Sequence, residues 1–128
     1  MPKRQSIYLT EYGHQNPIPS ACRIGDTLVS GIVYGRDPET GGPAQTLDAQ
    51  CELMFRYVRQ IVEAGGGSTD DIIKMTVWMK DRSQREPVNR EWEQMFPDPD
   101  DRPARQAMAA DLTGGILVQC DFIAKITE

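Results

Sequence analysis

A regular apolar stripe runs through the middle of the chain. From Leu47 to Val62, apolar side chains recur at intervals of three and four residues, which is the spacing of one buried helix face. Thr46 offers a side-chain oxygen as an N-cap, and Gly65 can adopt the left-handed conformation that ends a helix. The pattern predicts an amphipathic helix over 47–64.

Alternating, β-branched and aromatic segments predict strands before and after this helix. The most regular is 72–79, in which Ile73 and Met75 begin an apolar face and Lys74 begins the opposite one. The last two strands are expected to be joined through Thr113–Gly115 as a tight hairpin. In chain order, the predicted strands are 6–12, 27–31, 72–79, 104–112 and 115–126.

A second, shorter helix is predicted over 86–96, with Pro87 in its first turn and Val88 and Trp92 as apolar contacts. The order of elements indicates an α+β fold with a mixed β-sheet and two helices on one face. Residues 1–128 are expected to form a single domain. The other face of so small a sheet would leave apolar surface that a symmetric oligomer can bury.

Composition and charge narrow the class of partner. The chain is 39% apolar and 26% charged, as ordinary globular proteins are. Its net charge of -5 repels polyanions, so nucleic acid is an unlikely partner. No segment has the apolar length of a signal peptide or a membrane span, which predicts a cytoplasmic protein with no membrane partner.

The metal-binding residue types are scattered. Cys22, Cys51 and Cys120 form no CxxC motif, and His14 is the only histidine. Neither a disulfide framework nor a zinc site is indicated, and buried thiols are expected. His14 is expected to be a structural loop residue. We expect neither a metal nor a cofactor.

A series of short motifs extends along nearly the whole chain, in a fixed order and spacing. It includes HQNPIPSA at 14–21, VSG at 29–31, DPETG at 37–41, PAR at 103–105 and IA at 123–124. The series resembles the Rid superfamily, also called the YjgF or L-PSP endoribonuclease family. The resemblance implies a chorismate-mutase-like fold and a barrel-like homotrimer with equivalent clefts at the subunit interfaces.

The resemblance also implies an activity and a site. Best-known members of the family hydrolyse reactive imines or enamines, such as 2-aminoacrylate, to the keto acid and ammonia. In that pattern Arg105 binds the carboxylate of a small-molecule substrate, for which a planar guanidinium offers two parallel charge-assisted hydrogen bonds. Ser30 and Asn89 also fall on positions that belong to the family's site.

Three positions depart from the family pattern. Ala107 stands where active deaminases have a cysteine, Ile18 where a tyrosine is frequent, and Gln119 where a glutamate is thought to activate water. Glutamine can hold a water molecule but cannot accept its proton. A different gap before the last strand would bring Asp121 into that position instead. A cleft lined by Ile18 and Ala107 is compatible with a longer or less polar acid.

Three classes of function therefore remain open. The first is an imine or enamine deaminase that acts on a carboxylate-bearing substrate held by Arg105. The second is a metabolite-binding trimer that has lost hydrolysis, which Ala107 and Gln119 would permit. The third is an endoribonuclease, which is the weakest because RNA cleavage needs an acid, a base and cationic neutralisation of phosphate.

Overall fold

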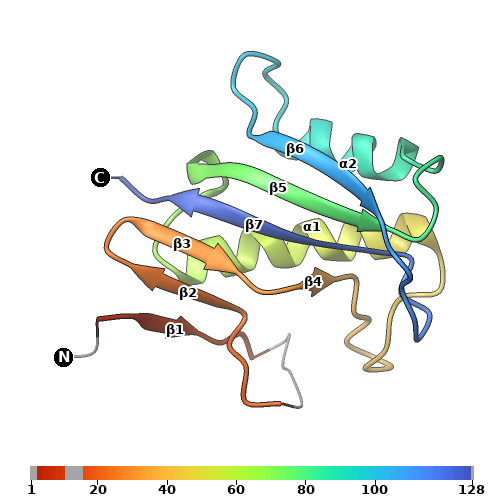
Figure 1. Cartoon of the computed structure of the whole chain (residues 1–128), viewed down its shortest axis with the longest axis horizontal. Helices are drawn as coiled ribbons and strands as arrows, with labels where there is room; N and C mark the ends of the chain where they lie inside the picture. Colours follow the sequence, from red (N-terminus) through yellow and green to blue (C-terminus); the bar gives the residue numbers. More distant parts are fainter. Residues whose placement is uncertain (1–2, 11–15, 128) are drawn as a thin grey trace.

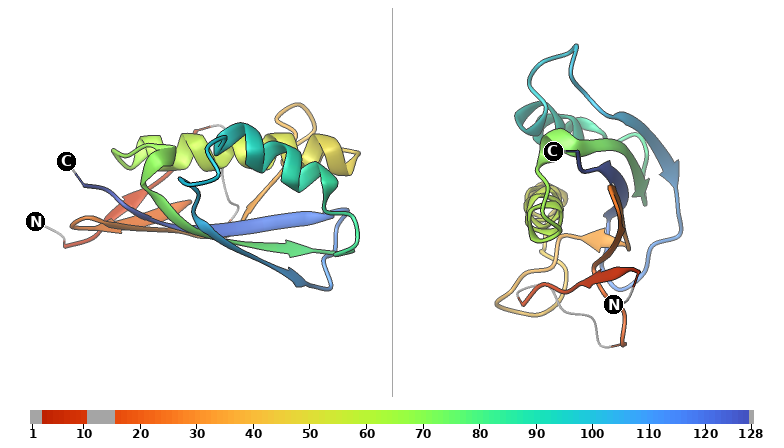
Figure 2. Two further views of the ribbon diagram at one scale, coloured as in Figure 1. Left: turned by 90° about the horizontal axis from the view of Figure 1, so that it is seen from above. Right: turned by 90° about the vertical axis from the view of Figure 1, so that its left-hand side faces the viewer.

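One mixed sheet and two helices form the two layers of a computed structural model that describes residues 3–10 and 16–127 (Figure 1). Both helices lie on one side of the sheet (Figure 2), which confirms the predicted α+β arrangement. No helix among the described residues is long and apolar enough to cross a membrane. The elements are β1 (Gln5–Ile7), β2 (Ala21–Ile24), β3 (Thr27–Ser30), β4 (Val33–Tyr34), α1 (Leu47–Ala64), the 3-10 turn η1 (Thr69–Asp71), β5 (Ile72–Met79), α2 (Glu86–Met95), β6 (Ala104–Ala109) and β7 (Val118–Lys125).

The sheet order places β6 at one edge and β1 at the other. The strands follow one another as β1-β2-β3-β7-β5-β6, and β4 also pairs with β7. Every pairing is antiparallel except that of β5 with β6, which is parallel. The predicted hairpin between the last two strands is therefore wrong, because β5 lies between β6 and β7. The turn at Thr113–Gly115 instead belongs to a crossing connection, in which Ile116 N donates to Thr113 O at 3.2 Å.

Helix α1 has the predicted bounds, but its end differs in detail. The Thr46 side chain accepts a hydrogen bond from Ala49 N at 3.1 Å, as expected for an N-cap. Gly65 is right-handed at φ −81, and the left-handed residue is Gly66 at φ +93. Gly65 is required for another reason, since a Cβ there would collide with the Leu28 side chain. Glycine is therefore favoured at position 65 by the limited space between α1 and the sheet, and not by the backbone angle.

The N-terminal strands differ from the prediction over 6–12. β1 ends at Ile7, whose carbonyl accepts a hydrogen bond from Ser20 N at 2.8 Å, and Tyr8 beyond it is 64% exposed. Positions 11 and 12 lie outside the described residues. β2 and β4 were not predicted, because four and two residues are too short to display an alternating pattern.

The predicted strand over 72–79 is β5, with one face changed at its start. Its pairing with β7 is irregular after Ile72, so Ile72 is buried and Ile73 is 49% exposed. The prediction that Ile73 shares the apolar face is therefore wrong. Met75, Val77 and Met79 are buried under the helices as predicted.

The outer face of the sheet, which no described helix covers, carries apolar side chains in directly opposed pairs. Val29 lies opposite Ile123, and Trp78 lies opposite Met108. Val29 is 45% exposed and Met108 is 42% exposed. Apolar surface of this kind on a single chain is typical of an interface with another chain.

A buried glutamine links α1 to two loops. Gln50 is 1% exposed, and its Nε2 donates to Ala44 O at 2.8 Å and to Gly115 O at 3.0 Å. Its Oε1 accepts from Leu117 N at 2.8 Å. Gly35 allows this close approach, since a Cβ there would collide with the Gln50 backbone. All these groups depend on one side chain for their partners.

We predict that Gln50→Met lowers the free energy of unfolding by about 2–3 kcal/mol, because it leaves the Leu117 amide and two carbonyls without partners. Urea-induced unfolding measures the difference. Gln60→Met on the same helix is the control, and it should cost less than about 0.5 kcal/mol. Equal losses in the two variants would contradict the role given to Gln50.

Candidate functional site

Arg105 extends from the edge strand toward the helix layer. In the parallel pairing of β5 and β6 it lies beside Met75, so its side chain is on the face of the sheet that the helices cover. β6 lies beyond the centre of α1, and here α2 flanks the strand (Figure 2). The Arg105 side chain is consequently half-buried against α2.

Two side chains of α2 hold the Arg105 guanidinium. Its Nη2 donates a hydrogen bond to Asn89 Oδ1 at 2.7 Å. Its Cζ lies 4.9 Å from the centroid of the Trp92 ring, within the range of a cation–π contact. Asn89 and Trp92 are three residues apart and so share one side of the helix. Trp92 is itself fixed by an edge-on contact with Phe96, with centroids 4.8 Å apart.

One donor of this guanidinium has no acceptor. Arg105 Nη1 is buried and has no hydrogen-bond partner in the described part of the chain. Burial lowers the pKa of Arg105, and repulsion from Arg85 lowers it further, but an arginine remains protonated. Buried donors are nearly always paired, so the arrangement favours an added acceptor such as a carboxylate. Protein atoms cover Nη1.

Ala107 lies on the same face of β6, two residues after Arg105 and beside Val77. Its half-buried methyl group brings no nucleophile or proton donor to this region. Asn89, Arg105 and Ala107 are thus the sequence-predicted site residues that one chain brings to the same side of the sheet. The sequence predicts Trp92 only as an apolar contact of the second helix, and its spacing from Asn89 is the signal that could have placed it here.

Ser30 and Ile18 lie toward the opposite edge of the sheet. The Ser30 hydroxyl accepts a hydrogen bond from Phe122 N at 2.9 Å and donates to Gly31 O at 2.8 Å. It thereby replaces a ladder bond to β7 where the chain passes from β3 to β4. Ile18, 48% exposed, lies in the loop before β2. Neither residue belongs to the same side-chain cluster as Arg105 within one chain.

Gln119 and Asp121 lie on the outer face of the sheet, because their neighbours in β7 are buried under the helices. Gln119 pairs in register with Trp78, whose Nε1 donates to Asp121 Oδ2 at 3.4 Å. Arg105 projects from the other face. Within a single chain, Gln119 and Arg105 cannot both contact one small substrate.

The thiols are poor candidates for nucleophiles. Burial raises the pKa of Cys51 to about 12 and raises the pKa of Cys120 as well. Cys22 is half-buried, and all three cysteines are free. Residues 3–10 and 16–127 contain no group of three His, Cys, Asp or Glu side chains that could hold a metal ion. His14 lies outside the described residues.

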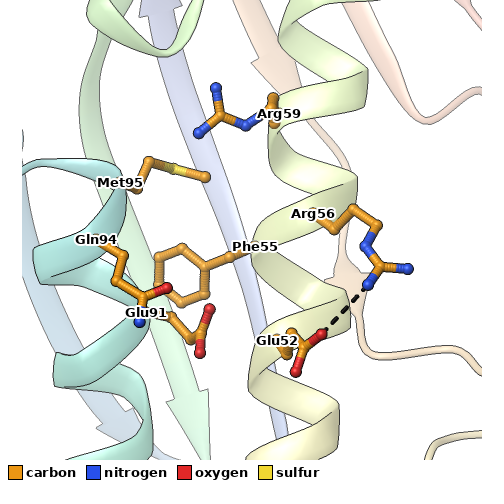
Figure 3. A pocket seen from close by; sticks show the side chains of 7 residues that line it. All are labelled: Glu52, Phe55, Arg56, Arg59, Glu91, Gln94 and Met95. Atoms are coloured by element: carbon orange, nitrogen blue, oxygen red, sulfur yellow. Dashed lines mark hydrogen bonds and ion pairs between the residues drawn. The ribbon is translucent and has the colours of Figure 1, made fainter.

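A separate hollow lies between the two helices (Figure 3). Its volume is about 330 Å³, and an ion pair of 3.3 Å joins Arg56 and Glu52 at its rim. None of Asn89, Trp92 and Arg105 lines this hollow, so it is separate from the Arg105 site. Its lining is Glu52, Phe55, Arg56, Arg59, Glu91, Gln94 and Met95.

Comparisons with known proteins agree with the motif series. A family model described as Endoribonuclease L-PSP matches residues 15–126. The 2-iminobutanoate/2-iminopropanoate deaminase of Salmonella typhimurium is 30% identical over 110 residues, covering 84% of this chain and 86% of that protein.

Solved structures show the same fold. A putative endoribonuclease of Thermotoga maritima, 27% identical, superposes with a TM-score of 0.86 over 97% of this chain and 98% of its own. RidA from a Psychrobacter species, 29% identical, gives a TM-score of 0.86 over 95% of this chain and 99% of its own. The agreement of sequence, motifs and fold shows that this chain belongs to the Rid, or L-PSP endoribonuclease, family.

Proposed function

We propose that the protein hydrolyses small 2-imino acids, or their enamine tautomers, to 2-keto acids and ammonia. The observation that carries the proposal is the Arg105 guanidinium, which Asn89 and Trp92 hold in place while its Nη1 has no acceptor among the described residues. A fixed guanidinium with a spare donor is suited to bind and orient a carboxylate. Curated relatives named as imino-acid deaminases support the same substrate class.

The reaction asks little of the protein beyond orientation. Water adds to the imine carbon, forming a C–O bond and delivering one proton to nitrogen. The resulting carbinolamine then breaks its C–N bond, ammonia leaves with the second proton, and a keto acid remains. A carboxylate held by Arg105 fixes the imine carbon relative to the attacking water, and such positioning lowers the barrier by itself.

We propose that a second copy of the chain completes the site, in a homotrimer. Arg105 lies at the β6 edge, whereas Ser30 and Ile18 lie toward the other edge and Gln119 lies on the outer face. A head-to-tail ring brings one edge of each copy against the opposite edge of the next. The exposed apolar pairs on the outer face, which include Val29, support burial in such a ring.

In this site Gln119 would orient water without taking its proton. A glutamine side chain both donates and accepts hydrogen bonds, so it can hold a water molecule, but it is no general base. Ala107 contributes space and no chemistry. A slow deaminase is therefore the expected activity, and a trimer that binds carboxylates without turnover is the second candidate, which the same two residues favour.

RNA cleavage has less support. The two side chains that contact Arg105 in the structure are an amide and an indole, neither of which is a general acid or base at neutral pH. The net charge of -5 also disfavours association with a polyanion.

We predict that Arg105→Ala weakens the binding of pyruvate, measured by calorimetry, by about 10-fold to 150-fold. Hydrogen bonds to charged groups contribute about 1.5–3 kcal/mol, which corresponds to that range. Arg59→Ala, which removes an exposed arginine from the other helix, is the matched control and should bind pyruvate normally. Light scattering should give a trimer for both variants. Unchanged affinity in Arg105→Ala would overturn the assignment.

We predict that Gln119→Glu raises kcat/KM for 2-aminoacrylate hydrolysis by about tenfold or more, since general-base catalysis contributes about 10²–10⁴-fold. A carboxylate acts as a base only when ionised, so the gain should appear as pH rises through the pKa of the new group and vanish in acid. Asp121→Asn is the comparison. If that variant abolishes activity while Gln119→Glu changes nothing, Asp121 and not Gln119 occupies the water-activating position.

A further inference from the structure

A second arginine, Arg85, lies at the N-terminal end of α2, the helix that contacts Arg105. Asn89 and Trp92, which hold the guanidinium, lie four and seven residues after Arg85, so all three side chains share one side of the helix. Arg85 is the N-cap residue, and its carbonyl accepts the helical hydrogen bond of Asn89 N at 2.9 Å. Arg85 is therefore one helical turn from the residue that touches Arg105.

Neither of these two charges is neutralised by the described chain. No ion pair of Arg85 or Arg105 occurs within residues 3–10 and 16–127. The Nε of Arg85 donates to the backbone carbonyl of Arg82 at 3.0 Å, and its side chain is exposed. Burial lowers the pKa of Arg105, and repulsion from Arg85 is the second, smaller cause of the same shift.

Helix stability does not explain an arginine at this position. Serine, threonine, aspartate and asparagine are the favoured N-caps, and Arg85 makes no side-chain capping hydrogen bond. A cation there also faces the positive end of the helix dipole. Arg85 thus adds positive charge at a position where both the helix dipole and Arg105 disfavour it. A residue that contradicts the N-cap preference in this way is often functional.

We propose that Arg85 binds a second carboxylate, and that the preferred substrates are short dicarboxylic imino acids with the carbon skeleton of aspartate or glutamate. This inference rests on the proposed function, in which Arg105 binds the carboxylate next to the imine. The distal carboxylate of such a substrate then meets Arg85. A monocarboxylate neutralises one guanidinium, whereas a dicarboxylate neutralises both.

The geometry suits a short spacer. Side chains four residues apart on a helix have Cβ atoms about 5–6 Å apart, and Asn89, between them in space, contacts Arg105 directly. Arginine has a long side chain, and the exposed Arg85 can close over a ligand by exchanging its hydrogen bond to Arg82 O for one to the ligand. A distal carboxylate on one or two methylene groups is therefore within reach of Arg85 when the first carboxylate is on Arg105.

The binding test compares two keto acids that differ by the second carboxylate, 2-oxobutanoate and 2-oxoglutarate. Wild-type protein should bind 2-oxoglutarate about fivefold more tightly by calorimetry at low salt, the scale of an exposed ion pair, and the preference should shrink at high salt. Arg85→Ala should remove the preference while leaving 2-oxobutanoate binding unchanged. Arg85→Lys should retain part of it, and Arg82→Ala, an exposed neighbour, should retain all of it.

Turnover gives an independent readout. The imino acids of glutamate and 2-aminobutanoate, generated in situ by an amino-acid oxidase, should show the same selectivity in kcat/KM, and Arg85→Ala should lower only the dicarboxylate value.

The two proposals fail differently. If Arg105→Ala leaves the binding of both keto acids intact, the proposed function fails. If Arg105→Ala weakens both ligands but Arg85→Ala leaves their ratio at the wild-type value, the proposed function stands and the role of Arg85 is refuted.

Discussion

The site depends on one partly desolvated positive charge. Asn89 and Trp92 restrict the Arg105 guanidinium, and burial of Nη1 without an acceptor in the described chain makes an oxygen ligand favourable. An exposed arginine would offer water the same donors and gain little from a carboxylate. Because the guanidinium is already held in position, binding loses less side-chain entropy and the ligand's orientation is defined. The packing of β6 against α2 therefore favours the proposed recognition of an anionic acid group.

Sheet topology imposes the second constraint. The parallel pairing with β5 directs Arg105 to the helix face, while alternation along β7 directs Gln119 to the outer face. Since a small substrate cannot contact both faces of one sheet, an active site that uses both residues requires two chains. The apolar outer face also favours association with a second chain, because burying side chains such as Val29 away from water is favourable in free energy. Contact between two chains would therefore both bury the apolar outer face and bring Gln119 and Arg105 to one site.

The chemistry of the site favours positioning over proton transfer. Gln119 and Ala107 supply neither a base nor a thiol, and Cys51 is held protonated by burial. An imine beside a carboxylate is electrophilic enough for orientation to matter on its own. Because the proposed site has neither a base nor a thiol, charge is its main means of discriminating among substrates. We propose that Arg85 and Arg105 together supply that charge.

The sequence by itself determined the helices, the α+β class and the family, because helical periodicity is a local signal and motif order is a collinear one. The tertiary structure alone decided that β5 separates β6 from β7, that Gly65 is needed for space under Leu28, and that Gln119 and Arg105 face opposite sides. Three features depend on pairing between distant segments. They are the order of the strands, the close contacts between elements, and the side of the sheet to which a residue points after a bulge. Alternation within one strand carries no record of which strand lies beside it, and this is the physical reason that the sequence left these points open.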